Sequence, residues 1–262
     1  LLYIGSVYYK KGDYLKAIEY YEKSYKILKS IYSDNFIDHS YIAFYHYYMG
    51  QVYFKKNNNE IALLNYERAL QIWTNLFSMN RNHIFIAYVY NQIGSVYYKM
   101  RNYKNASEYY TKSFTIKKKV HRDKIDHLDF ASSFNNFGLI ELENDNYEIA
   151  LEYFQKSYDI WKPIYSNTSL NNTNIAIHFK NVGLVYMKKN EIEKGLNYLN
   201  RAIQIWNIVY ENNKTDPDIV STQTIIYNSN SKNINYDLIY FLKKLLILFL
   251  YIFLLLILTL FQ

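Results

Sequence analysis

The chain has 262 residues, enough for one or two domains, and carries a formal net charge of +7. It contains no cysteine, which excludes a disulfide framework, a thiolate zinc site and a thiol nucleophile. The positive charge accompanies an excess of Lys, Asn, Tyr and Ile, whose codons are A/T-rich. Base composition therefore accounts for the charge, and no nucleic-acid partner is expected.

Five glycines define an internal repeat of 44 or 45 residues: Gly5, Gly50, Gly94, Gly138 and Gly183. A small residue follows each glycine after twelve positions. A large apolar residue follows after sixteen positions: Tyr21, Tyr66, Tyr110, Phe154 and Leu199. A period of this length predicts a solenoid of stacked units rather than one globular core. The two remaining glycines leave none for a phosphate-binding loop.

Each repeat is predicted to form two antiparallel helices. In the third repeat, Tyr90, Ile93 and Tyr97 step by three or four positions, as an apolar helix face requires, and the spacing resumes at Ala106. Pro163 is expected to end the second helix of the fourth repeat early, because it has no backbone N–H to donate. Four polar residues are expected to cap the second helices: Asp13, Asn58, Asn102 and Asn146.

The order apolar-Gly, Tyr, small, aromatic, small resembles the tetratricopeptide repeat (TPR) over about 1–217. The resemblance implies an all-α fold, a right-handed TPR superhelix (α-solenoid) of about five helix-turn-helix repeats. The extra length after each second helix carries the pairs Asp38-His39, Asn82-His83 and Asp126-His127, which resembles the long repeat of kinesin light chains. Within it, Phe134-Asn135-Asn136-Phe137-Gly138 resembles their LNNLG-type first helix.

The predicted repeats run over about 1–39, 40–83, 84–127, 128–171 and 172–217. Residues 218–237 are expected to form a degenerate cap or linker, because no glycine continues the register there. Leu1 already lies within the first helix of a repeat, so the sequence is interpreted as a fragment of a longer protein.

Residues 238–262 form a hydrophobic tail. From 245 to 261 every residue except Thr259 is apolar, and Lys243 and Lys244 precede this run. A helix of this length would span about 25 Å, close to a bilayer core. One interpretation is therefore a membrane anchor that holds the repeats on the cytoplasmic side. The other is an artefact of the gene model, translated from A/T-rich non-coding sequence.

No catalytic residue, cofactor or metal site is predicted. His39, His83 and His127 recur, but stacked helices lie roughly 10 Å apart and zinc ligands about 2 Å from the ion, so these three cannot converge on one metal. They are expected to be turn or cap residues. Three tryptophans also recur at one repeat position, which favours packing between second helices over a ligand cage: Trp73, Trp161 and Trp206.

Two columns of residues on the first helices form the candidate binding site. The column three residues before the glycine contributes Tyr47, Asn91, Asn135 and Lys180. The column five residues after it contributes Lys10, Lys55, Lys99 and Lys188. The columns lie eight residues apart and therefore share one helix face, the face that lines the concave side of a TPR array.

These columns predict a groove for an extended or helical peptide with acidic and apolar anchors. The alternative is that the lysines are solvated helix ends. The resemblance to kinesin light chains implies that Asn135, and at the same repeat position Asn91, contact a cargo peptide.

The predicted function is a protein–protein interaction scaffold or adaptor of the kinesin-light-chain type. Kinesin light chains associate with the motor subunit through a heptad coiled coil, and this sequence contains none. Association with a kinesin motor subunit is therefore left open. Leu2 and Ser6 stand where the carboxylate clamp of chaperone-binding TPR proteins needs Lys and Asn, so chaperone C-termini are not expected partners. Two alternatives are a non-catalytic repeat arm of a larger enzyme and a tail-anchored membrane docking receptor.

Overall fold

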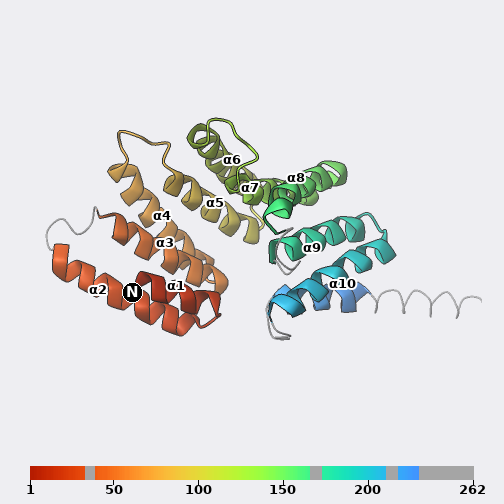
Figure 1. Cartoon of the computed structure of the whole chain (residues 1–262), viewed down its shortest axis with the longest axis horizontal. Helices are drawn as coiled ribbons and strands as arrows, with labels where there is room; N and C mark the ends of the chain where they lie inside the picture. Colours follow the sequence, from red (N-terminus) through yellow and green to blue (C-terminus); the bar gives the residue numbers. More distant parts are fainter. Residues whose placement is uncertain (33–38, 166–172, 211–217, 230–262) are drawn as a thin grey trace, which may run out of the picture. The chain divides into compact units, whose positions relative to one another are not determined.

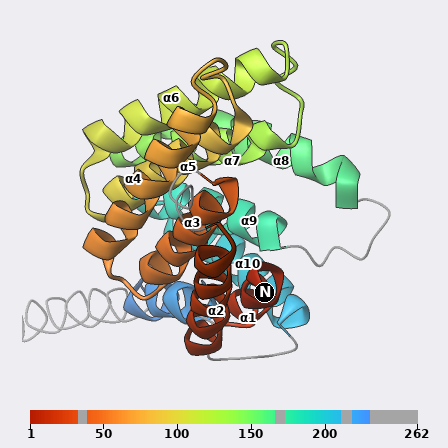
Figure 2. The same cartoon turned by 90° about the vertical axis from the view of Figure 1, so that its left-hand side faces the viewer.

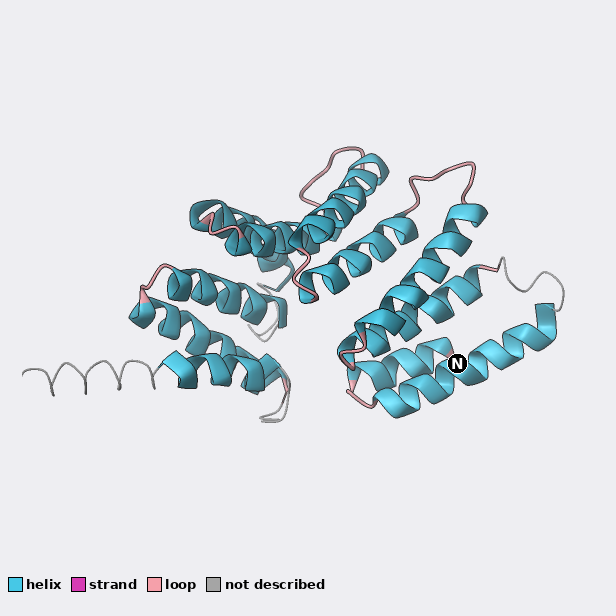
Figure 3. Cartoon of the chain, turned by 180° about the vertical axis from the view of Figure 1, so that it is seen from behind, coloured by secondary structure: helices cyan, strands magenta, loops and turns pink. Residues whose placement is uncertain are grey.

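The computed structural model describes residues 1–32, 39–165, 173–210 and 218–229 (Figure 1). The helices are α1 (Leu2–Lys10), α2 (Tyr14–Tyr32), α3 (Ser40–Lys55), α4 (Asn59–Leu76), α5 (Ile84–Lys99), α6 (Tyr103–Val120), α7 (Asp129–Glu143), α8 (Tyr147–Tyr165), α9 (Thr173–Lys188) and α10 (Ile192–Val209). A further helical segment occupies 218–229. No strand occurs in these described residues, so the expected all-α class is confirmed (Figure 3).

The chain divides into two compact units, Leu1–Asn167 and Thr168–Gln262. The first unit holds four helix pairs: α1/α2, α3/α4, α5/α6 and α7/α8. The second holds the pair α9/α10 and the helical segment 218–229, in which Ile219 and Thr222 are buried.

In the first unit, successive helix pairs pack side by side (Figures 1 and 2). Each second helix packs against the first helix of the next pair. The first helices also contact one another directly, α1 with α3, α3 with α5 and α5 with α7. They form one continuous surface, which we call the first-helix face, as expected of a solenoid in which each unit contacts its neighbours.

The two helices of a pair approach most closely at the repeat glycine. A methyl group on Gly94 would lie 2.7 Å from two ring carbons of Tyr110 and 3.2 Å from the carbonyl oxygen of Ala106. The same crowding occurs at Gly50, where the ring of Tyr66 lies 2.6 Å from such a methyl group. The glycine column thus exists because a large side chain of the second helix rests on the backbone of the first.

The turn inside each pair is closed by a residue with positive φ. These residues stand seven positions after the repeat glycines: Gly12, Asn57, Arg101, Asp145 and Asn190. The next residue donates its N–H to the carbonyl oxygen five positions back, as Asn58 does to Tyr53 at 2.9 Å, which satisfies a carbonyl at the end of the first helix.

The same turn residues also start the second helix. Asn58 and Asn102 cap α4 and α6, and Asp13 accepts the N–H of Lys16. Asn146 was expected to do the same for α8, but its amide donates to Glu141 at 2.7 Å instead.

The histidines between repeats are turn and cap residues, as expected from the sequence. His39 and His83 are the N-caps of α3 and α5, and His127 directly precedes Leu128, the N-cap of α7. The Nδ1 atoms of His39, His83 and His127 accept backbone N–H groups two residues further on, at 3.3, 3.3 and 3.2 Å. The imidazole thus satisfies one of the N–H groups that have no partner within the first turn of the helix.

The expectation for Pro163 was wrong. Helix α8 continues through Pro163 to Tyr165. A proline near the end of a helix removes only one main-chain hydrogen bond and does not stop the last turn from forming.

Two of the three repeated tryptophans, Trp73 and Trp206, are almost fully buried. Trp73 is a packing residue, but its ring partners lie on first helices and not on second helices: Phe44 on α3, edge-on at 5.0 Å between ring centroids, and Phe85 on α5, at 5.2 Å. In the third repeat the equivalent position is Lys117, whose side chain is also buried, at 1% relative exposure. The third repeat is therefore chemically different at this contact.

The hydrophobic tail at 245–261 lies outside the described residues. None of the described helices combines the length and the apolar character that a membrane span requires.

We predict that Gly94→Ala lowers the free energy of unfolding by about 1–3 kcal/mol, because the added methyl group overlaps the Tyr110 ring and outweighs the gain in helix propensity. Gly12→Asn is the matched control. Its position has positive φ and open space, and Asn already occupies it in two other repeats, so we expect a change below about 0.5 kcal/mol. Urea unfolding of the two variants checks this, and equal stabilities would contradict it.

We also predict that Tyr66→Phe leaves the protein equally stable or stabilises it by up to about 1 kcal/mol. The Tyr66 hydroxyl is buried and has no hydrogen-bond partner among the described residues, and Phe154 fills this position in the fourth repeat. Tyr110→Phe is the control, because the Tyr110 hydroxyl donates to Ser95 at 3.3 Å. Thermal unfolding should show a lower stability for Tyr110→Phe alone. An equal loss of stability in both variants would refute the argument.

Candidate functional site

The first-helix face carries the predicted site residues of the first unit. Tyr47, Asn91 and Asn135 lie on α3, α5 and α7 and are half-buried. The exposed lysines Lys10, Lys55 and Lys99 stand at the carboxyl ends of α1, α3 and α5. Lys180 and Lys188 lie on α9 and belong to the second unit.

Asn91 takes part in a contact between repeats. The side-chain amide of Asn136 donates to its side-chain oxygen at 2.8 Å. Asn136 is buried, and it is the neighbour of the predicted Asn135. The hydrogen bond from α7 to α5 is thus made by Asn136, and the role of Asn135 in binding a peptide stays a prediction.

Lys99 also bridges two repeats. Its ammonium donates to the carbonyl oxygen of Phe54 at 2.9 Å and lies 4.4 Å from the centroid of the Phe54 ring. Partial burial, and then the positive charge of Lys55, lower the pKa of Lys99. Among the described residues neither lysine has an acidic partner, so two cations lie close together on this face without a counter-charge.

Tyr47 and Tyr98 supply the aromatic surface beside these lysines. Burial raises the pKa of Tyr47 to about 12, and its ring lies 6.0 Å from the ring of Trp73, so Tyr47 mainly packs the core. The hydroxyl of Tyr98 donates to Glu143 at 3.2 Å. Glu143 stands where the other repeats have lysine, and this interaction occupies its carboxylate.

In the second unit, Lys180 lies over α10 and the helical segment 218–229. Its ammonium donates to the hydroxyl of Ser221 at 3.1 Å and lies 5.7 Å from the ring of Trp206. Lys188 is exposed at the end of α9.

An apolar cavity of about 410 Å³ lies where α1, α2 and α3 meet. Leu2 and Tyr3 line it from α1, Leu28 from α2, and Phe44 and Tyr48 from α3. Leu2 belongs to the same repeat column as Tyr47 and Asn91, so the cavity adjoins the first-helix face.

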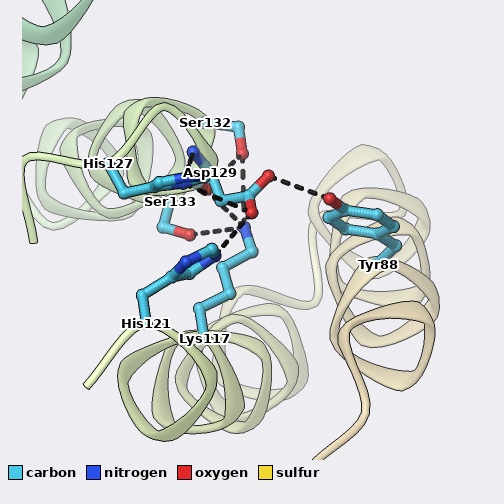
Figure 4. Close-up of polar contacts among 7 residues, drawn as sticks. All are labelled: Tyr88, Lys117, His121, His127, Asp129, Ser132 and Ser133. Carbon is cyan, nitrogen blue, oxygen red and sulfur yellow. Dashed lines mark hydrogen bonds and ion pairs between the residues drawn. The ribbon is translucent and has the colours of Figure 1, made fainter. Parts of the chain in front are cut away.

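A polar cluster that the repeat pattern does not reveal lies between α6 and α7 (Figure 4). Nε2 of His121 lies 2.6 Å from Oδ2 of Asp129, and Nδ1 of His127 lies 3.5 Å from the same oxygen. The hydroxyl of Tyr88 donates to Oδ1 at 2.9 Å, from α5. The buried ammonium of Lys117 donates to the backbone oxygen of Asp129 and to the hydroxyl of Ser133, each at 2.8 Å.

Two family models match the sequence, and both describe the tetratricopeptide repeat. One matches 1–75 and 41–119, and the other matches 130–165, so that together they cover more than half of the chain. The chain belongs to the tetratricopeptide repeat family. The TPR fold is generally that of a non-catalytic scaffold for interactions between proteins. No curated protein matches the sequence.

Solved structures share the TPR fold at low sequence identity. BtubC (BKLC) from P. vanneervenii is 19% identical, with 77% of this chain and 76% of that chain covered and a TM-score of 0.56. The Rap conjugation gene regulator of the plasmid pLS20, in complex with the Phr* peptide, is 18% identical, with 87% and 62% covered and a TM-score of 0.61. A putative kinesin light chain of Podosopora anserina is 14% identical, with 78% and 92% covered and a TM-score of 0.51.

Lys117 is an unusual residue for a packed interior, because lysine is rarely fully buried. Burial lowers its pKa to about 8, although the nearby Asp129 carboxylate acts in the opposite direction. The charged form is therefore disfavoured in the folded state by on the order of 3 kcal/mol relative to a free lysine. Three hydrogen bonds, two at 2.8 Å and one to Ser132 at 3.4 Å, partly offset this cost.

The lowered pKa of Lys117 predicts a pH-dependent stability for this TPR chain. Below about pH 8 Lys117 is protonated in both the folded and the unfolded chain, and the cost of burying its charge lowers the free energy of unfolding in full. Between about pH 8 and about pH 10 the unfolded chain binds more protons, so the free energy of unfolding should rise with pH. Denaturant unfolding in chelator-treated buffer should show this rise in the wild type and not in Lys117→Met.

The measurement should stop near pH 9.5, because buried tyrosines with raised pKa, such as Tyr98, destabilise the fold at higher pH in both proteins. Parallel curves for the wild type and Lys117→Met would contradict the prediction.

Proposed function

We propose that this protein is an interaction scaffold whose first-helix face binds a peptide segment of a partner protein through acidic and apolar side chains. The observation that carries the proposal is the Lys55–Lys99 pair. These two cations share one part of the face, the charge of Lys55 contributes to the lowered pKa of Lys99 after partial burial, and neither has an acidic partner among the described residues. An acidic side chain placed between them would relieve this repulsion.

Apolar contacts for the same segment are available next to the lysines. Tyr9, Phe54 and Tyr98 are half-buried and present aromatic surface along the face. The cavity beside Leu2 could accept one apolar side chain, because its walls are mostly apolar. Together they favour a segment that alternates acidic and apolar anchors, in the manner of an extended or helical peptide.

The structural likeness to the Rap regulator in complex with the Phr* peptide supports a peptide ligand as the partner class. The likeness to a putative kinesin light chain supports an adaptor of the kinesin-light-chain type. We further propose that Asn91 and Asn135 contact the peptide and that Tyr47 forms the floor beneath it. Lys10 would extend the cationic column in the first unit, and Lys180 and Lys188 would supply cations in the second.

Selection of peptides from a random displayed library on the full chain tests the proposal. We expect the selected sequences to be enriched in Asp and Glu, and Lys55→Glu/Lys99→Glu to weaken their binding at least tenfold, which corresponds to about 1.4 kcal/mol. Fluorescence anisotropy with one labelled acidic peptide provides the measurement. Binding should also weaken as salt is added, because exposed charges are screened.

The matched control is Lys26→Glu/Lys104→Glu, which makes the same change of charge at exposed positions on the second helices α2 and α6. It should leave the affinity within about twofold of the wild type. An equal loss in both double variants, or selected peptides without acidic residues, would exclude the first-helix face as the site. Circular dichroism confirms that each variant stays helical.

A further inference from the structure

The connection between the third and fourth repeats differs from the preceding one at the same register. Three aromatic residues are replaced by polar ones 44 residues later: Trp73 by Lys117, Phe77 by His121 and Phe85 by Asp129. The histidine before the first helix is kept, as His83 and then His127. Three neighbouring positions have therefore changed together from apolar to polar.

The fold itself does not require this polar set. The ring of Phe77 stacks on His83 with 3.6 Å between centroids, and His121 stacks on His127 at 3.7 Å. An aromatic residue thus closes the equivalent turn in the same geometry. A buried polar network is commonly no more stable than apolar packing of the same volume, so its presence here calls for a function.

His121, His127 and Asp129 bring three potential metal-ligand atoms close together. One ligand atom from each of His121, His127 and Asp129 lies within 4.8 Å of the others. Oδ2 of Asp129 contacts only the two imidazoles among the described residues, because Tyr88 binds Oδ1 and Lys117 binds the backbone oxygen. Two nitrogen donors and one carboxylate oxygen form the ligand set of many zinc sites.

We infer that His121, His127 and Asp129 bind a divalent transition-metal ion of the zinc class, with Tyr88 as the residue that orients the carboxylate. The sequence-based expectation of no metal site considered only histidines one repeat apart. The structure instead pairs His127 with His121, which lies in the same connection.

One ligand separation already suits zinc, whereas another must widen and the two stacked imidazole rings must turn toward a common ion. Ligands about 2.1 Å from a tetrahedral ion lie about 3.4 Å apart. His127 Nδ1 is already 3.5 Å from Asp129 Oδ2, whereas the 2.6 Å separation of His121 from that oxygen must widen as a metal ion replaces the shared proton. Coordination through Nδ1 of His127 would also replace its 3.2 Å hydrogen bond from the N–H of Asp129.

The exposure of the three ligands gives an ion a route of entry. The side chain of His127 is 47% exposed, whereas those of His121 and Asp129 are 17% and 20% exposed. A fourth coordination position would thus face water. The bound ion would join the end of α6 to the start of α7 and fix the connection between two repeats.

Titration of Zn²⁺ into the metal-free full chain by calorimetry tests the inference. We expect one Zn²⁺ per chain, a rise in the melting temperature, and much weaker binding of Mg²⁺, which avoids imidazole. Bound Co²⁺ should give the visible absorption of a tetrahedral site with nitrogen ligands. His121→Phe, which copies Phe77, and Asp129→Asn should each reduce zinc affinity by more than about 100-fold.

Tyr88→Phe should reduce zinc affinity about 10- to 100-fold, as is usual for a residue that orients a ligand, without changing the stoichiometry. His83→Ala is the matched control, because it removes the corresponding histidine of the preceding connection and should leave zinc affinity unchanged. Equal zinc binding by the wild type and His121→Phe would overturn the inference, as would full binding by Asp129→Asn or equally strong binding of Mg²⁺. His127→Ala, at an exposed position, gives an independent test should the other variants unfold.

Discussion

Each helix pair depends on the contact between a glycine in the first helix and a large side chain of the second. Because the ring of Tyr66 or Tyr110 rests directly on the backbone, a single added methyl group would collide with it. This one contact sets the distance between the two helices, and the pair can then present both of its outer surfaces to neighbouring pairs. The identity of the large residue matters less, since Phe154 and Leu199 replace tyrosine in the later repeats.

Packing between pairs is more variable in its chemistry than packing within them. Trp73 and Phe85 close one connection with aromatic contacts, 5.2 Å between their centroids, whereas Lys117 and Asp129 close the next with hydrogen bonds. A solenoid tolerates such differences because each repeat contacts only its neighbours, so a polar interface affects one junction and leaves the others unchanged. The same property allows the first-helix face to carry lysine in three repeats of the first unit and Glu143 in the fourth.

Periodicity and cap chemistry made most of the fold predictable from the sequence. Gly94 and its counterparts set the register, and Asn58 and His83 act locally, so their roles follow from neighbouring residues. Contacts that cross between repeats were harder to predict. Asn136 rather than Asn135 reaches Asn91, and the burial of Lys117 depends on serines and an aspartate on the next helix. Periodicity identifies which residues share a face, but not how far each side chain reaches.

Three hydrogen bonds between neighbouring first helices run along the same side of residues 1–167. They join Lys99 to Phe54, Asn136 to Asn91 and Tyr98 to Glu143, each across 45 residues of sequence. Such bonds resist separation of the helices that they join. We therefore expect the resistance of α3, α5 and α7 to bending to depend on direction. Bending that opens the first-helix side stretches these bonds, whereas bending in the opposite direction leaves them intact. A partner that binds along this side would add stiffness in the direction in which these bonds already act.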